Sequence, residues 1–276
     1  MDEAGRYPAD ELRRFVVALL TAHGWTTIQA GAIAAYWLWL ETVEARDSGL
    51  ARLPELLDAA ASGAITPGQS GRLAKERSAV AVLEAESAAL ALALIRAGEL
   101  ASQKAGETGV GLVRIVGLDR EGIPTAPVLA DMALGPNLAF ALGPGGAWGV
   151  AVPTPGGLPA VLDSSLGPKG TKPRGKAPAA LRDLIPGAGW LAGEASVVVG
   201  AIQLNAIDDV ERFQERMGLM FESWVDQAGL FLPETFAKAR ERAGSEGLAV
   251  GQEVLRKLGR VAELHGIETP SMRKSR

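Results

Sequence analysis

The spacing of apolar residues predicts helices at both ends of the chain. Apolar positions recur at helical spacing from Phe15 to Leu20, and Gly24 predicts the end of this first helix. A second helix, with Thr27 expected as its cap, is predicted to run to about Ala45. The remaining terminal helices are predicted at Ala51–Ala61, Asp208–Trp224, Glu234–Ala243 and Gly251–Leu264.

The middle of the chain changes to short apolar runs, which are typical of buried strands. Ser78–Leu83 and Gly111–Val116 are such runs, with an alanine-rich helix predicted at Ala88–Lys104 between them. Later runs are separated by Gly/Pro turns, which favours further strands. These runs are Leu138–Leu142, Gly149–Val152, Ala160–Leu162 and Ala195–Leu204.

This order of elements predicts an α/β (α+β) protein, with a central mixed sheet flanked by N- and C-terminal helices. We expect a discontinuous helical lobe formed by residues 1–70 and 205–276, and a sheet-containing lobe formed by residues 71–204. The glycine-rich stretches at 109–111 and 143–146 do not complete Gly-x-Gly-x-x-Gly before a helix. A Rossmann fold is therefore not expected.

The composition excludes several classes of protein. The formal charge is −4, which argues against a general nucleic-acid binder. The absence of cysteine excludes disulfides, thiolate nucleophiles and Cys-ligated zinc, and it fits a reducing cytoplasm. The N-terminus is charged where a signal peptide needs an apolar run. Neither Ile28–Leu40 nor Ala79–Gly98 is expected to span a membrane, so we expect a cytoplasmic protein.

Two features of the sequence have an ordinary and a functional interpretation. The apolar side chains of Tyr36–Leu40 point around most of a helix, which indicates core packing or a subunit interface. The chain has only two histidines, His23 and His265, each directly before a glycine at a predicted helix end. Imidazole suits the negative end of the helix dipole, so we interpret both as structural and predict no metal site.

A basic loop lies within residues 167–180, which read GPKGTKPRGKAPAA. Gly170 to Lys176 has the spacing of a phosphate-binding P-loop, but Ala177 stands where Ser or Thr would hold magnesium. Such a loop is usually solvated, and its other interpretation is contact with a phosphate or an acidic partner. Its cations are Lys169, Lys172, Arg174 and Lys176.

Residues 41–54, ETVEARDSGLARLP, resemble a motif of the malate/L-lactate dehydrogenase-like (type 2) family, Ala-Asp-Leu-Arg-Gly-x-Asp-Ser-His-Gly-x-x-Arg-Leu. Aligned on the glycine, Gly49, Arg52 and Leu53 match, and Ser48 replaces the histidine. The segments LLDAAASGAI (56–65), GVGLVR (109–114) and IQLNAID (202–208) also resemble family segments, so the resemblance spans most of the chain.

The resemblance implies an NAD(P)-dependent reductase of small 2-oxo or imino acids, and a homodimer. It implies that Arg52 binds a substrate carboxylate, which a guanidinium can hold with two parallel hydrogen bonds. It also implies NAD or NADP as the cofactor, with Lys169, Lys172 and Arg174 as candidate cofactor-binding residues.

The sequence departs from the family where protons are transferred. A serine hydroxyl such as that of Ser48 does not titrate near pH 7, whereas imidazole does. The segment RIVGLDREG (114–122) also lacks the family's second histidine, and Asp119 in its neighbourhood is the candidate replacement acid. Loss of a general acid costs roughly 10²–10⁴ in rate.

Two hypotheses follow from these departures. The first is a divergent homologue that binds a small carboxylate near Ser48 and Arg52, with altered or lost redox activity. The second is a non-catalytic paralogue that acts as a subunit or binding partner of another enzyme, with Tyr36–Leu40 as part of the interface.

Overall fold

The structure is a computed structural model that describes residues 4–45, 48–118, 123–144, 147–166, 196–222 and 230–273. It contains two compact units. Unit 1 comprises Met1–Ser70, Ser87–Leu92 and Glu234–Arg276, and unit 2 comprises Gly71–Glu86 and Ala93–Pro233. The division into lobes at residues 70/71 and 204/205 stays a prediction.

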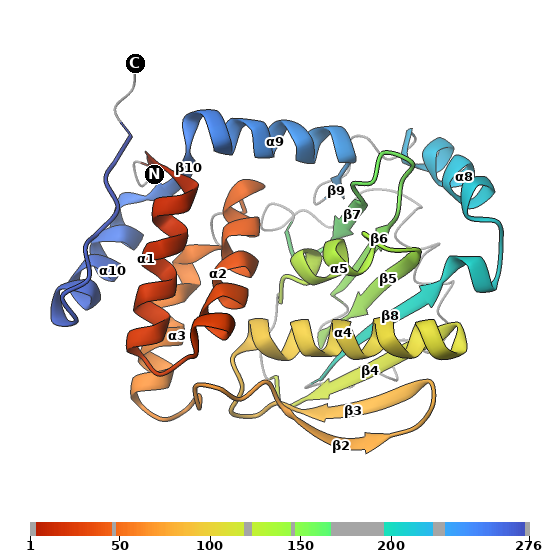
Figure 1. Cartoon of the computed structure of the whole chain (residues 1–276), viewed down its shortest axis with the longest axis horizontal. Helices are drawn as coiled ribbons and strands as arrows, with labels where there is room; N and C mark the ends of the chain where they lie inside the picture. The colour runs from red at the N-terminus through yellow and green to blue at the C-terminus, as the bar shows by residue number, and fades with distance from the viewer. Residues whose placement is uncertain are drawn as a thin grey trace. The chain divides into compact units, whose positions relative to one another are not determined.

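Unit 1 is built from helices and a small sheet (Figure 1). The sheet pairs β1 (Ala4–Tyr7) antiparallel with β10 (Leu248–Gly251), so residues near the two ends of the chain share one ladder. The helices are α1 (Ala9–Ala22), α2 (Thr27–Thr42), α3 (Leu53–Ala61), α9 (Pro233–Glu246, in unit 1 from Glu234 onward) and α10 (Gln252–Leu264).

The second helix begins at Thr27, and its cap is Thr26 rather than the predicted Thr27. The Thr26 side chain accepts a hydrogen bond from the backbone N–H of Gln29, and the Gln29 side chain accepts one from the backbone N–H of Thr26. This reciprocal capping box satisfies two donors at the helix start. Gln29 at the third helical position therefore decides which threonine is the cap.

The Tyr36–Leu40 segment of α2 is mainly buried, which confirms the packing interpretation. Tyr36, Trp37, Leu38 and Leu40 are buried, and Trp39 stacks on Phe236 of α9 with ring centroids 5.3 Å apart. The helix packs against α1, whose buried face contains Leu12, Phe15, Val16, Leu19 and Leu20. Burying a side chain of this size contributes about 1.5–3 kcal/mol.

Unit 2 is organised around an eight-stranded sheet with the order β2-β3-β4-β8-β5-β6-β7-β9. Only β3 and β4 pair in parallel, and α4 (Leu90–Thr108) connects them; all other neighbours are antiparallel. The strands are β2 (Arg72–Glu76), β3 (Val80–Glu84), β4 (Val110–Val116), β5 (Asn137–Leu142), β6 (Trp148–Val152), β7 (Ala160–Asp163), β8 (Ser196–Gln203) and β9 (Leu230–Phe231).

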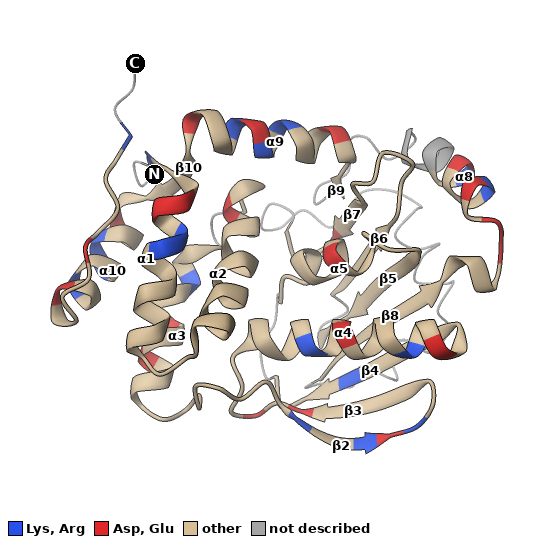
Figure 2. Ribbon diagram, in the orientation of Figure 1, with Lys and Arg blue, Asp and Glu red and all other residues tan. Residues whose placement is uncertain are grey.

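This topology confirms the predicted fold class, because a mixed sheet with one parallel pair is not a Rossmann sheet. The helices α5 (Ala126–Met132) and α8 (Val210–Glu222) also belong to unit 2. The edge strand β2 carries charged residues (Figure 2), which discourage pairing with another chain. Within the described part of the chain, no helix is both long and apolar enough to cross a bilayer.

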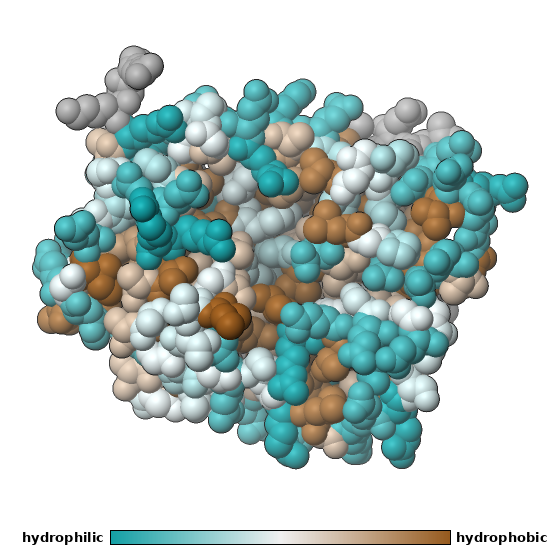
Figure 3. All heavy atoms as spheres, viewed as in Figure 1, coloured by the Kyte–Doolittle hydropathy of each residue, from teal (hydrophilic) through white to brown (hydrophobic). Residues whose placement is uncertain are grey.

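Charge and hydropathy are mixed on the surface. The helix α9 has no buried residue, and Figure 2 shows charges of both signs along it. On the face shown in Figure 3, hydrophobic residues form several small groups among hydrophilic ones. Small scattered groups of this kind are normal on a protein surface and do not by themselves identify an interface.

Candidate functional site

The segment with the family motif follows α2 through a turn that Glu44 makes possible. Glu44 has φ 58°, the left-handed conformation that non-glycine residues rarely adopt. Its carboxylate pairs with Arg242 of α9 at 2.9 Å, and the following Ala45 N–H donates to Leu40 O at 2.9 Å. The turn therefore ends α2 and redirects the chain toward Ser48.

A buried carboxylate holds the next part of this turn. Glu41 is only 4% exposed, and its Oε1 accepts a hydrogen bond from the backbone N–H of Leu50 at 2.6 Å. A Cβ added at Gly49 would lie 2.3 Å from the same oxygen. Gly49 is thus required by the close approach of Glu41. The family motif predicted this glycine, whereas no pattern in the sequence indicated Glu41 as its partner.

This turn positions both candidate carboxylate-binding residues. Ser48 is partly buried, and its backbone N–H donates to Ala45 O at 2.9 Å. Arg52 ends a short 3₁₀ helix, Leu50–Arg52, and is the N-cap residue of α3. Its side chain is 43% exposed and lies 3.7 Å from Glu55. Ser48 and Arg52 therefore lie on either side of one short turn, which the buried Glu41 carboxylate holds in place.

We expect Glu41→Ala to lower the free energy of unfolding by about 1–3 kcal/mol, because it leaves the buried Leu50 N–H without its acceptor. Glu41→Gln keeps an acceptor oxygen at this position and is expected to cost less. Urea denaturation followed by circular dichroism measures both. Equal stabilities of the two variants would contradict the anchoring role of Glu41 Oε1.

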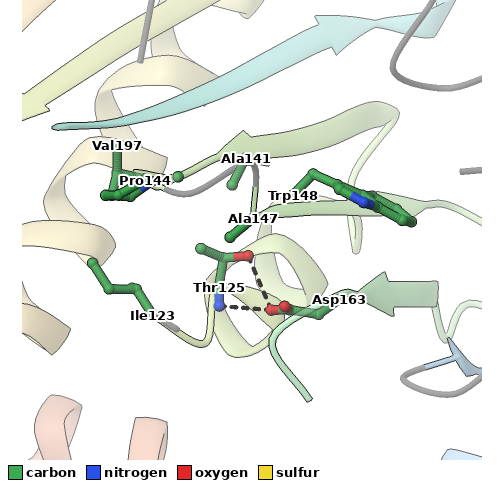
Figure 4. A pocket seen from close by; sticks show the side chains of 9 residues that line it. Ile123, Thr125, Ala141, Pro144, Ala147, Trp148, Asp163 and Val197 are labelled. Atoms are coloured by element: carbon green, nitrogen blue, oxygen red, sulfur yellow. Dashed lines mark hydrogen bonds between the residues drawn. The ribbon is translucent and has the colours of Figure 1, made fainter. Parts of the chain in front are cut away.

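Unit 2 contains a second polar centre, at Asp163 on the last position of β7 (Figure 4). Asp163 Oδ2 accepts hydrogen bonds from Thr125 N at 2.7 Å, Ala126 N at 2.8 Å and Thr125 Oγ1 at 3.0 Å. Its Oδ1 accepts from Ser165 N at 2.8 Å and Ser165 Oγ at 2.6 Å. With 1% exposure, this carboxylate is buried and receives five hydrogen bonds.

The Asp163 carboxylate fixes the start of α5, which has Thr125 as its N-cap. Gly149 of β6 permits this arrangement, because a Cβ there would lie 2.6 Å from Thr125 Oγ1. Trp148, Ala147, Pro144 and neighbouring residues line a cavity of about 10 Å³ beside the pair. Such a volume holds about one water molecule. Neither Asp163 nor Thr125 was predicted as a site residue from the sequence.

The other candidate residues lie outside the described part of the chain. They are Asp119, the proposed acid, and the basic residues Lys169, Lys172, Arg174 and Lys176. Where the structure is described, no three His, Asp or Glu side chains gather in a way that could hold a metal ion. His23 and His265 are the C-cap residues of α1 and α10, which confirms their predicted place at helix ends.

Comparison with protein families finds a match to part of the chain. Residues 7–134, which include Ser48, Gly49 and Arg52, match the family model described as malate/L-lactate dehydrogenase. Over this range, the chain is similar to the malate/L-lactate dehydrogenase family. The resemblance predicted from the sequence is therefore confirmed, and the Glu41–Gly49 turn belongs to the family region. Asp163 lies beyond the matched residues.

Several solved structures of dehydrogenases have a similar fold. Malate dehydrogenase from Pyrococcus horikoshii OT3 superposes with a TM-score of 0.73 and 18% identity, covering 98% of this chain and 100% of that one. Malate dehydrogenase from Entamoeba histolytica gives 0.75 and 12%, with the same coverage. Sulfolactate dehydrogenase from Methanocaldococcus jannaschii gives 0.71 and 15%, covering 95% and 98%. No curated protein matches the chain.

Proposed function

We propose that this protein is a divergent homologue of NAD(P)H-dependent 2-oxo acid/2-hydroxy acid oxidoreductases that binds a small carboxylate near Arg52, with altered or lost redox activity. The observation that carries the proposal is the turn held by Glu41 and Gly49, which presents a 43% exposed Arg52 in the family region. A guanidinium held in this way suits a carboxylate, because it can donate two parallel hydrogen bonds.

The expected loss of activity rests on the proton donors. Ser48 stands where the family motif has a histidine, and a hydroxyl does not titrate near neutral pH. Asp163 is committed to five hydrogen bonds from Thr125, Ala126 and Ser165. Asp119 stays the proposed alternative acid. Without an efficient acid, we expect a rate lower by about 10²–10⁴.

The proposed cofactor is NAD or NADP, with Lys169, Lys172 and Arg174 as proposed contacts, and this part of the proposal rests on the family alone. These three residues lie outside the described part of the chain. The cavity beside Asp163 has about 10 Å³, whereas small-molecule sites usually have about 300–1,000 Å³. We therefore derive no hydride-transfer step.

The central test is carboxylate binding. Titration of the protein with L-malate and L-lactate by calorimetry is expected to detect binding that Arg52→Ala weakens at least about tenfold, since hydrogen bonds to charged groups are worth about 1.5–3 kcal/mol. Arg256→Ala, which removes an exposed arginine of α10, is the matched control and is expected to change nothing. Absence of binding, or equal weakening in both variants, would refute the carboxylate site.

The redox part of the proposal has a separate readout. Six tryptophans supply intrinsic fluorescence for titrations with NADH and NADPH. Failure of both to bind at near-millimolar concentration would mean that the redox role is lost. Reduction of pyruvate or oxaloacetate at an ordinary enzymatic rate of about 1–10³ s⁻¹ would contradict altered or lost activity.

A homodimer is the partner we propose from the family. The alternative, a non-catalytic subunit of another enzyme, drew its support from Tyr36–Leu40 as an interface. Tyr36, Trp37, Leu38 and Leu40 are buried, so most of this segment offers little exposed surface to a partner. We therefore retain the carboxylate-binding homologue as the proposed function.

A further inference from the structure

The two histidines of the chain lie side by side, although they are far apart in sequence. His23 follows α1 and His265 follows α10, and both belong to unit 1. Their ring centroids are 4.9 Å apart, with an angle of 60° between the ring planes. His23 is partly buried and His265 is exposed, so the pair is open to solvent. Neither histidine has a role in the proposed carboxylate site.

We propose that His23 and His265 form a two-imidazole site for a divalent transition-metal ion, with water as the remaining ligands. The hydrogen bonding of His23 supports this. Its Nδ1 lies 2.8 Å from the carbonyl oxygen of Leu19. Because a carbonyl oxygen only accepts, Nδ1 carries the proton, and the neutral ring then presents the lone pair of Nε2. Metal-binding histidines commonly donate their other N–H to a backbone carbonyl in this way.

The spacing of the rings also fits a shared ion. A zinc–nitrogen bond is about 2.0–2.1 Å long, which places each ring centroid about 3.2 Å from the metal. Two rings on one ion then have centroids about 4.5 Å apart at a ligand angle of 90° and about 5.2 Å apart at the tetrahedral angle. The observed 4.9 Å between His23 and His265 lies between these values.

The two helix ends favour a cation at this place. Both imidazoles follow the last turn of a helix, of 14 residues in α1 and 13 in α10. The C-terminal end of a helix carries about half a negative charge, which attracts cations. Imidazole ligands suit copper, nickel and zinc ions. A bound ion would connect α1 with α10. It would stabilise the folded state, because it would bind the folded protein and not the unfolded chain.

The experiment uses the full-length protein without a histidine tag. Calorimetry with Zn²⁺ is expected to detect one site per chain, with affinity reduced at least about tenfold in both His23→Gln and His265→Gln, since even the loss of an outer partner commonly costs 10–100-fold. Asp131→Asn, which changes an exposed carboxylate of unit 2, is the control and is expected to bind Zn²⁺ as the unsubstituted protein does.

A second measurement does not depend on the variants. Because the chain has only two histidines, its proton NMR spectrum contains two imidazole C2–H signals. Paramagnetic Cu²⁺ at a small fraction of the protein concentration is expected to broaden both signals together. Absence of Zn²⁺ binding, unchanged binding after either histidine substitution, or broadening of one signal alone would each overturn the site and leave only a ring contact.

Discussion

Asp163→Ala is expected to destabilise the protein by about 3–5 kcal/mol, because it leaves several buried donors without an acceptor at about 1–3 kcal/mol each. These donors are the backbone N–H groups of Thr125 and Ala126 and the Thr125 hydroxyl. Since whole domains are stable by only about 5–15 kcal/mol, such a loss is severe. Chemical denaturation followed by circular dichroism measures it.

The matched control is Asp131→Ala, which removes an exposed carboxylate from α5, the helix whose start Asp163 fixes. We expect it to change stability by no more than about 0.5 kcal/mol. Asp163→Asn keeps one acceptor oxygen but directs an NH₂ group at other donors, so an intermediate loss is expected. If Asp163→Ala were as stable as Asp131→Ala, the hydrogen-bond network described for this carboxylate would be wrong.

Gly111→Ala is expected to cost about 3 kcal/mol or more, at the upper end of overpacking penalties. A Cβ at Gly111 in β4 would lie 1.9 Å from the backbone oxygen of Ala101 in α4. Neither backbone can yield easily, because β4 is paired on both sides and α4 is a continuous helix. Soluble yield and the denaturation midpoint are the measurements.

Gly106 lies in α4, the helix next to Gly111, but its surroundings are open. A Cβ at Gly106 meets no atom within 4 Å, so Gly106→Ala removes a flexible residue from a helix without a clash. We expect a gain of about 0.5–1 kcal/mol. Destabilisation by Gly106→Ala, or tolerance of Gly111→Ala, would contradict the packing of α4 on β4.

Elements with a long, regular pattern could be predicted from the sequence. The helices α1 and α10 were located within a few residues, because their apolar spacing ends at His23-Gly24 and His265-Gly266. The strands β1, β2, β9 and β10 and the helix α5 were missed. β1 and β10 have four residues each and exist through pairing between distant segments, which no local pattern encodes. α5 has only seven residues and contains Pro127 near its start.

The residues of the candidate site that belong to a sequence motif could be predicted. Those that are defined by tertiary contacts could not. Gly49 and Arg52 were found by matching the family motif. Glu41 was not found, because its partner Leu50 lies on the other side of a turn. This turn depends on the left-handed conformation of Glu44, which no sequence pattern indicates. Asp163 is the last residue of the otherwise apolar strand β7, which is a weak signal for a buried acid. Its partner Thr125 is 38 residues away, and no spacing rule connects the two.

The ladder between β1 and β10 has a consequence for synthesis on the ribosome. Ala4–Tyr7 is made well before its partner Leu248–Gly251, because all strands of the larger sheet lie between them in the sequence. At about 5–20 residues per second, the first strand waits about 10–50 s for its neighbour. The strands of the larger sheet are complete by Phe231, so that sheet can assemble while α1 and α2 still lack their C-terminal partners. The larger sheet can therefore form before the ladder between β1 and β10.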